Sequence, residues 1–190
     1  RTFYEESARV PAILSWPGVL PEGQTCDHVL SALDLGATML DAMAAPALPH
    51  SPGRSALDLL KTGSGDWEDV AFSEYCLYEG VTQRMIRQDE WKLIYHHGQP
   101  PQLFNLRQDP VEEFDRASDP ACRSRLSDLR ARVLDNWDPD HVARRVQERR
   151  KEMELIVKWS ANVDAPEQFN WQRLAQMSWS ETLGEGPGQT

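Results

Sequence analysis

Cysteines are few in this chain, and they lack the spacing that makes them ligands. The 190 residues include three, Cys26, Cys76 and Cys122, which lie far apart in the sequence. Structural zinc sites use closely spaced Cys or His pairs, so a zinc site is not expected. An odd number of scattered cysteines gives no disulfide framework either. We therefore expect reduced thiols in a cytoplasmic protein.

Long apolar runs and an excess of basic residues are also missing. No stretch approaches the roughly 20 apolar residues that span a bilayer, so no membrane partner is predicted. Lys and Arg number 20 against 30 Asp and Glu, a formal net charge of −10, which argues against nucleic acid as a partner. Nine basic residues do cluster between positions 123 and 151. We interpret them as solvated faces of two helices rather than as an anion-binding surface.

The first third of the sequence reads as part of an α/β unit. An apolar run over residues 10–16, bounded by Pro11 and by Pro17-Gly18, predicts a strand buried on both faces. Residues 31–43 predict a helix capped by Ser31. Residues 56–60 predict a short helical turn that ends at a glycine-rich loop.

The pattern changes after residue 65. Short alternating runs predict strands over residues 69–75, 82–87, 91–96 and 101–106, which together form a small antiparallel sheet. Two helices follow, one capped by Ser118 or Asp119 and the other beginning at Asp138-Pro139. Their predicted apolar faces are Leu126, Leu129, Val133 and Leu134 in the first, and Val142, Val146, Met153, Ile156 and Val157 in the second. We divide the chain into the end of a large α/β domain (1–65), an α+β subdomain (66–160) and a tail (161–190).

Six motifs occur in an order that is typical of one family. They are Tyr4-Glu5 with Arg9-Val10-Pro11, Ser31-x-x-Asp34, Gly53-x-Ser55, Ser73-Glu74-Tyr75, Met85-Ile86-Arg87 before Trp91-Lys92, and Leu103-Phe104-Asn105-Leu106 before Asp109-Pro110-x-Glu112. In this order they resemble the C-terminal portion of sulfatases of the alkaline phosphatase superfamily, most closely the choline-sulfatase and arylsulfatase-like branch. The resemblance implies an α/β fold, the C-terminal part of an alkaline-phosphatase-like sandwich with a small antiparallel sheet and packed helices as its subdomain.

The resemblance also implies hydrolysis of a small-molecule sulfate ester. In that family a formylglycine made from Cys or Ser is the nucleophile, and a divalent cation, commonly Ca²⁺, neutralises the sulfate. The family's active-site lysine would stand directly before Arg1. Neither the nucleophile motif nor the family's Asp-His-Gly metal motif occurs here, so we expect the cation to be bound by residues absent from this chain, and the chain alone to be inactive.

Three residues are candidates for substrate binding. Glu74 and Tyr75 end a predicted strand, where a carboxylate and an aromatic ring could face a cationic substrate group. His96 ends the predicted hairpin and could line a pocket, although the sequence favours a hydrogen-bonded structural histidine there. Glu5 is predicted to pair with Arg9 or to cap its loop.

The remaining partner is a second copy of the chain, since Trp159, Trp171 and Trp179 suggest a homo-oligomer contact. Two other functions stay open: a phosphonate monoester hydrolase or phosphodiesterase of the same superfamily, and a non-catalytic interaction module.

Overall fold

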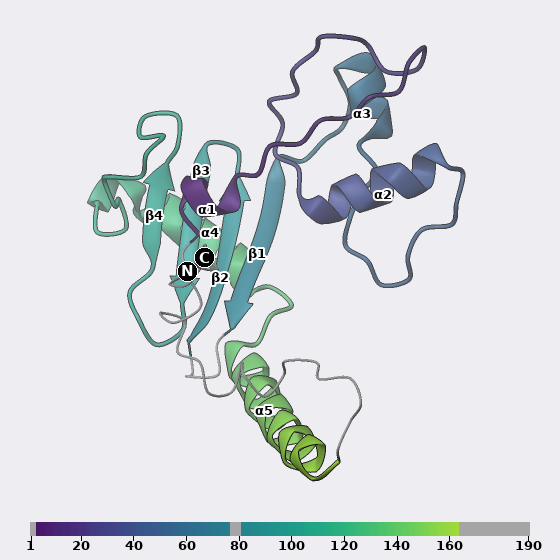
Figure 1. Cartoon of the computed structure of the whole chain (residues 1–190). Coiled ribbons are helices and arrows are strands. Elements are labelled where there is room, and N and C mark those ends of the chain that lie inside the picture. The colour runs from purple at the N-terminus through teal and green to yellow at the C-terminus, as the bar shows by residue number, and fades with distance from the viewer. Residues whose placement is uncertain (1–2, 77–80, 164–190) are drawn as a thin grey trace, which may run out of the picture.

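The computed structural model describes residues 3–76 and 81–163. A four-stranded sheet forms its centre, a lobe containing helices α2 and α3 lies beyond one end of the sheet, and the long helix α5 projects from the other (Figure 1). None of the helices in these residues combines the length and apolar character needed to cross a membrane.

The sheet is an antiparallel meander in the order β1-β2-β3-β4. Its strands are β1 (Val70–Cys76), β2 (Thr82–Gln88), β3 (Trp91–His96) and β4 (Gln102–Asn105). β2 and β3 are joined by a two-residue turn in which Asp89 has a φ of 53°. The predicted small sheet is confirmed, each strand lying within a few residues of its expected position.

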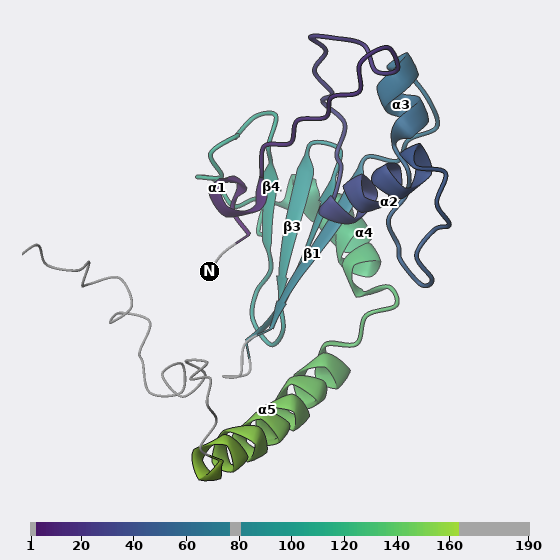
Figure 2. The same cartoon turned by 45° about the vertical axis from the view of Figure 1, so that its right-hand side comes forward.

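Each face of the sheet is covered by a different helix (Figure 2). The short helix α1 (Glu5–Ala8) lies on one face, over a core of Phe3, Met85, Ile94, Phe104 and Leu106. Helix α4 (Arg123–Leu134) covers the other face, where Leu129 and Val133 pack on Ile86, Leu93 and Leu103. A 3₁₀ turn, η1 (Pro120–Cys122), leads into α4 and is capped by the Asp119 side chain, as predicted.

The α2–α3 lobe is held by hydrogen bonds and by a few buried apolar side chains, Ala56, Leu57 and Leu59. Ser31 caps α2 (Ala32–Ala42) in a capping box with Asp34. The second carboxylate oxygen of Asp34 accepts the Arg54 amide N–H at 2.9 Å, and the Thr38 hydroxyl oxygen accepts the Ala56 amide at 2.9 Å. These bonds fasten α2 to the loop that leads into α3 (Leu57–Thr62).

Two sequence expectations do not hold in the structure. Residues 10–16 are extended but form no strand, and Ile13 is 95% exposed, so the predicted burial on both faces is wrong for the described chain. Helix α5 (Pro139–Asn162) begins where predicted, with Asp138 as its cap, but its apolar face contains no buried residue. Both segments have the expected local pattern, but the described residues do not bury either of them fully.

Candidate functional site

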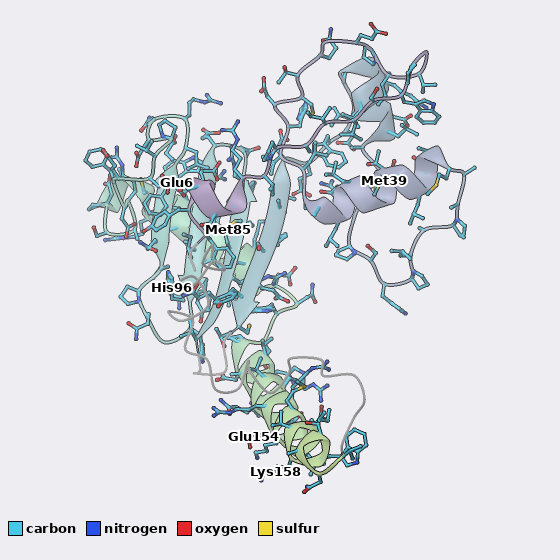
Figure 3. All side chains as sticks on the ribbon, viewed as in Figure 1. Glu6, Met39, Met85, His96, Glu154 and Lys158 are labelled. Carbon is cyan, nitrogen blue, oxygen red and sulfur yellow. The ribbon has the colours of Figure 1, made fainter. Side chains whose placement is uncertain are left out.

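The pleat of β1 places Glu74 on the opposite face of the sheet from Tyr75 and His96, the other two predicted site residues. Tyr75 pairs with Gln83 on β2, and Gln83 pairs in turn with His96 on β3. Tyr75 and His96 therefore share one row across the sheet, on the face covered by α1, because directly paired residues point to the same side. Glu74 is the neighbour of Tyr75 along β1, so its side chain points to the opposite face. Figure 3 places His96 toward the end of the sheet that lies away from the α2–α3 lobe.

Hydrogen bonds extend the Tyr75–His96 row toward α1. His96 Nε2 lies 3.2 Å from the side-chain oxygen of Gln102, and the Gln102 amide nitrogen donates to the Tyr4 hydroxyl at 3.0 Å. The Tyr4 ring is tilted against Phe104, at 5.8 Å between ring centroids. We call Tyr4, Tyr75, Gln83, His96 and Gln102 the polar row. Half-buried aromatic rings beside amide and imidazole groups can both stack on a ligand and hydrogen-bond its hydroxyls.

Glu74 faces a different environment, beside Arg84. Glu74 and Arg84 are directly paired across β1 and β2. The Arg84 guanidinium lies over the Phe72 ring at 4.7 Å and donates to the Val133 carbonyl at 3.0 Å. Burial lowers the pKa of Arg84, while the charge of Glu74 opposes that shift. Burial also raises the pKa of the Cys76 thiol, with a smaller contribution from Glu74. Glu74 is thus an electrostatic partner of a half-buried arginine.

The most buried charges belong to a cluster that the sequence did not predict. The side chain of Lys92 is fully buried, and its ammonium group donates to the Phe3 carbonyl at 2.8 Å and to Glu112 Oε1 at 2.8 Å. It also lies 2.7 Å from Glu5 Oε1, and Glu5 Oε2 accepts from Arg87 at 3.0 Å. The Lys92 cluster, meaning Lys92 with Glu5, Glu112 and Arg87, fastens α1 and the loop after β4 to the sheet. Glu5 thus pairs with Lys92 and Arg87, and the predicted pairing with Arg9 is wrong.

Two opposing effects act on the ionisation of Glu5. Burial raises the pKa of its carboxyl, but the hydrogen bond and charge of Lys92, aided by Arg87, outweigh burial. The net pKa lies below the ordinary value, so Glu5 is ionised at neutral pH. A lysine within an apolar strand sequence, Trp91-Lys92-Leu93, was the one local signal that could have indicated such a cluster.

The described residues offer no metal centre. Among residues 3–76 and 81–163, no three His, Cys, Asp or Glu side chains converge in a way that could hold a metal ion. The carboxylates of Glu5 and Glu112 both pair with Lys92, and Glu5 pairs with Arg87 as well. The Asp109 carboxylate accepts the amides of Glu113 and Phe114, which makes it a turn-forming group. These residues do not fit the calcium that the resemblance implies.

Comparison with known proteins decides the family. Residues 1–138, well over half of the chain, match the family model described as N-sulphoglucosamine sulphohydrolase, C-terminal. The chain belongs to the sulfatase family. This sulfatase chain is similar to a Delta 4,5-hexuronate-2-O-sulfatase of Bacteroides thetaiotaomicron, with 30% identity over 146 residues that cover 72% of the chain and 30% of that protein. It is 29% identical over 156 residues to the choline-sulfatase of Rhizobium meliloti, covering 78% of the chain and 30% of that protein.

Solved structures agree with the family assignment. A Bacteroides thetaiotaomicron structure described as a sulfatase matches with a TM-score of 0.61 and 29% identity, covering 79% of the sulfatase chain and 33% of the other. A phosphonate monoester hydrolase from Silicibacter pomeroyi matches with a TM-score of 0.53 and 25% identity, covering 63% and 27%. The sulfatase chain therefore spans about a third of the length of these relatives. The predicted fold and resemblance, the C-terminal part of a sulfatase, are confirmed.

Proposed function

We propose that this chain is the C-terminal part of a sulfatase that hydrolyses a small-molecule sulfate ester. The observation that carries the proposal is the family match over residues 1–138, a range that contains all six motifs. The formylglycine and a divalent cation, Ca²⁺ or another, would be supplied by the part of the longer protein outside this sequence. Within the described residues the chain would contribute binding surface, with no nucleophile and no metal ligand of its own.

The polar row is the surface that we propose for substrate contact. It joins two of the predicted residues, Tyr75 and His96, on one face and adds Tyr4, Gln83 and Gln102 to them. Hydroxyl, amide and imidazole groups beside aromatic rings suit the organic part of an ester rather than its sulfate. Glu74 remains the candidate for substrate contact on the opposite face of the sheet.

The activity is tested on the longer polypeptide that contains this sequence. We expect it to cleave an aryl sulfate faster than an aryl phosphonate monoester, to lose activity on chelation and to recover it with Ca²⁺. The reverse preference would favour the phosphonate monoester hydrolase function, which the Silicibacter pomeroyi match keeps as a second candidate. If neither ester is hydrolysed, the result would favour the non-catalytic interaction module. The 190-residue chain alone should be inactive on both.

The substrate surface is tested by comparing two variants of the active protein. His96→Gln keeps a hydrogen-bonding side chain but changes its reach to Gln102, so we expect KM to rise about 10-fold or more with a smaller change in kcat. Glu74→Gln, on the other face, should leave KM unchanged. The opposite result, with KM altered only by Glu74→Gln, would place the substrate on the α4 side of β1.

The homo-oligomer is proposed on exposed apolar residues of α5. Leu155, Ile156 and Trp159 are exposed near its C-terminal end. Trp171 and Trp179, the other two residues predicted for this contact, lie outside the described residues. The cytoplasmic location stays a prediction.

A further inference from the structure

The hydrogen bonds of the polar row run in one direction, from His96 to Tyr4. The side-chain oxygen of Gln102 can only accept, so His96 Nε2, 3.2 Å away, donates to it. The Gln102 amide nitrogen donates in turn to the Tyr4 hydroxyl at 3.0 Å. That hydroxyl keeps its own proton for a further acceptor, and His96 Nδ1 keeps a lone pair when the ring is neutral. Tyr4 is therefore the end of the row that can donate to a ligand, and His96 is the end that can accept.

The position of Tyr4 is set by the Lys92 cluster rather than by α1 itself. Helix α1 has only four residues, and a single helical turn is not stable by itself. The Lys92 ammonium group donates to the Phe3 carbonyl at 2.8 Å and lies 2.7 Å from Glu5 Oε1. A carboxylate oxygen of Glu112 accepts the Glu5 amide. The cluster thus fixes the residues directly before and after Tyr4, and with them the direction of its side chain.

This attachment is more elaborate than one helical turn needs for stability. Glu112 has a φ of 57°, a left-handed conformation that is unfavourable for a residue with a side chain. The Phe3 ring already anchors the same turn in the apolar core. Exchanging a whole buried ion pair for apolar residues is often neutral for stability, whereas charge-assisted hydrogen bonds add direction. Backbone strain and buried charge around Tyr4 therefore indicate a site where orientation matters.

We propose that Tyr4 is a specificity-determining residue, which donates its hydroxyl proton in a hydrogen bond to an oxygen of the organic part of the ester, and that the Lys92 cluster positions it. This role rests on the proposed function and gives the polar row a direction, with a donor at Tyr4 and an acceptor at His96. Figure 3 shows α1, labelled at Glu6, above Met85, with His96 farther along the sheet. An organic group that carries oxygen should bind better than a hydrocarbon group of the same size, because only the former can accept from Tyr4.

Steady-state kinetics of the longer polypeptide on two sulfate esters test the donor role. One ester has a polyol as its organic part, and the other has an alkane alcohol of similar size. We expect Tyr4→Phe to raise KM for the polyol ester about 5-fold or more with kcat changed by about 2-fold or less, and to change KM for the alkyl ester by about 2-fold or less. Equal changes in KM for the two esters would overturn the donor role, and so would an unchanged KM for both.

A double-mutant cycle tests whether the Lys92 cluster acts through Tyr4. Glu112→Gln removes the charge of Glu112 and keeps its size. We expect it to raise KM for the polyol ester about 5-fold in the wild type, but by about 2-fold or less in Tyr4→Phe. Leu129→Ala is the control and should leave KM unchanged, because Leu129 supports the same sheet from the opposite face. An equal effect of Glu112→Gln in both backgrounds, no effect in either, or a raised KM in Leu129→Ala would contradict positioning through Tyr4.

Hydrogen exchange at Ser7 and Ala8 separates the positioning role from the proposed function. The amides of both residues donate to the Tyr4 carbonyl, at 2.8 and 2.9 Å. In the longer polypeptide, Glu112→Gln should speed their exchange about 10-fold or more relative to the amide of Ile94, which reports the sheet. A polypeptide that hydrolyses neither ester would refute the proposed function and the donor role with it, while these rates would still decide whether the cluster holds Tyr4. Unchanged rates at Ser7 and Ala8 overturn the positioning role in either case.

Discussion

At the scale of single residues, Lys92 is the side chain whose loss we expect to affect stability most. Its ammonium group has three oxygen partners from two other parts of the chain, the Phe3 carbonyl and the carboxylates of Glu5 and Glu112. The side chain of Glu112 is only 1% exposed. A carboxylate that stays buried after its cation is removed keeps its desolvation cost without the ion pair that offset it.

We therefore expect Lys92→Met to lower the free energy of unfolding by about 3–5 kcal/mol, the loss typical of breaking a buried ion pair. Lys61→Met is the control, because Lys61 lies exposed on α3 and its loss should cost no more than about 0.5 kcal/mol. Denaturant unfolding of both variants measures the difference. A loss at Lys92 as small as that at Lys61 would show that the cluster contributes nothing net to stability.

The lowered pKa of Glu5 predicts a pH dependence of stability. In the folded state this carboxyl has a pKa below its ordinary value of 4.5. The unfolded chain therefore takes up the proton first as the pH falls. The stabilisation is fully present above about pH 5 and is lost as the pH falls through the folded-state pKa. In unfolding measurements between pH 6 and 3, Glu5→Gln should show a shallower loss of stability with acid than the wild type.

The neighbouring Glu6→Gln is the control for the Glu5 experiment. Glu6 lies on the same short helix, and its side chain is exposed. We expect its pH profile to follow that of the wild type. Profiles of Glu5→Gln and wild type that run parallel would mean that Lys92 and Arg87 do not hold the Glu5 carboxylate in the folded state.

At the scale of elements, the close contact between α2 and the following loop requires a glycine at position 53. A Cβ on Gly53 would lie 2.3 Å from the Leu33 carbonyl oxygen, a backbone atom that cannot move without disturbing α2. Gly36 lies within α2, and a Cβ there meets nothing within 4 Å. The two glycines therefore have opposite roles, one required by a close approach and one that only weakens its helix.

We expect Gly53→Ala to destabilise the chain by roughly 1–3 kcal/mol through overpacking, and Gly36→Ala to stabilise it by roughly 0.5–1 kcal/mol through lower backbone entropy in the unfolded state. Far-ultraviolet circular dichroism during thermal unfolding compares the two variants with the wild type. Opposite signs support this account of the α2 contact, and destabilisation by both would contradict it.

The sequence predicted those elements whose signals are local. Ser31 and Asp34 mark the start of α2 three residues apart, and Asp119-Pro120 marks the entry to α4, so both helices were found. The Lys92 cluster was not found, because Lys92 and Phe3 are 89 positions apart and no local pattern joins them. The face shared by Tyr75 and His96 required the register of β1, β2 and β3, which residue types alone do not give. Residues 10–16 carry a strand signal in their composition, yet they form no strand among the described residues.

At the scale of the whole molecule, stability should be uneven between its parts. The sheet, α1 and α4 bury two apolar clusters, one on each face. The α2–α3 lobe buries only Ala56, Leu57 and Leu59 among its apolar side chains, and α2 itself buries only Asp34 and Thr38. Buried apolar area is the main source of folding free energy, and few buried contacts lower the free energy of local opening.

We therefore expect the lobe to open before the sheet unfolds. In native-state hydrogen exchange of the 190-residue chain at rising denaturant, the amides of Ile86 and Leu93 should exchange only through global unfolding, and those of α2 through a smaller opening at least about 10-fold more often. Denaturant curves followed in α2 and in the sheet should then not coincide. A single free energy shared by both regions would mean that the lobe is coupled to the sheet as strongly as through an apolar interface.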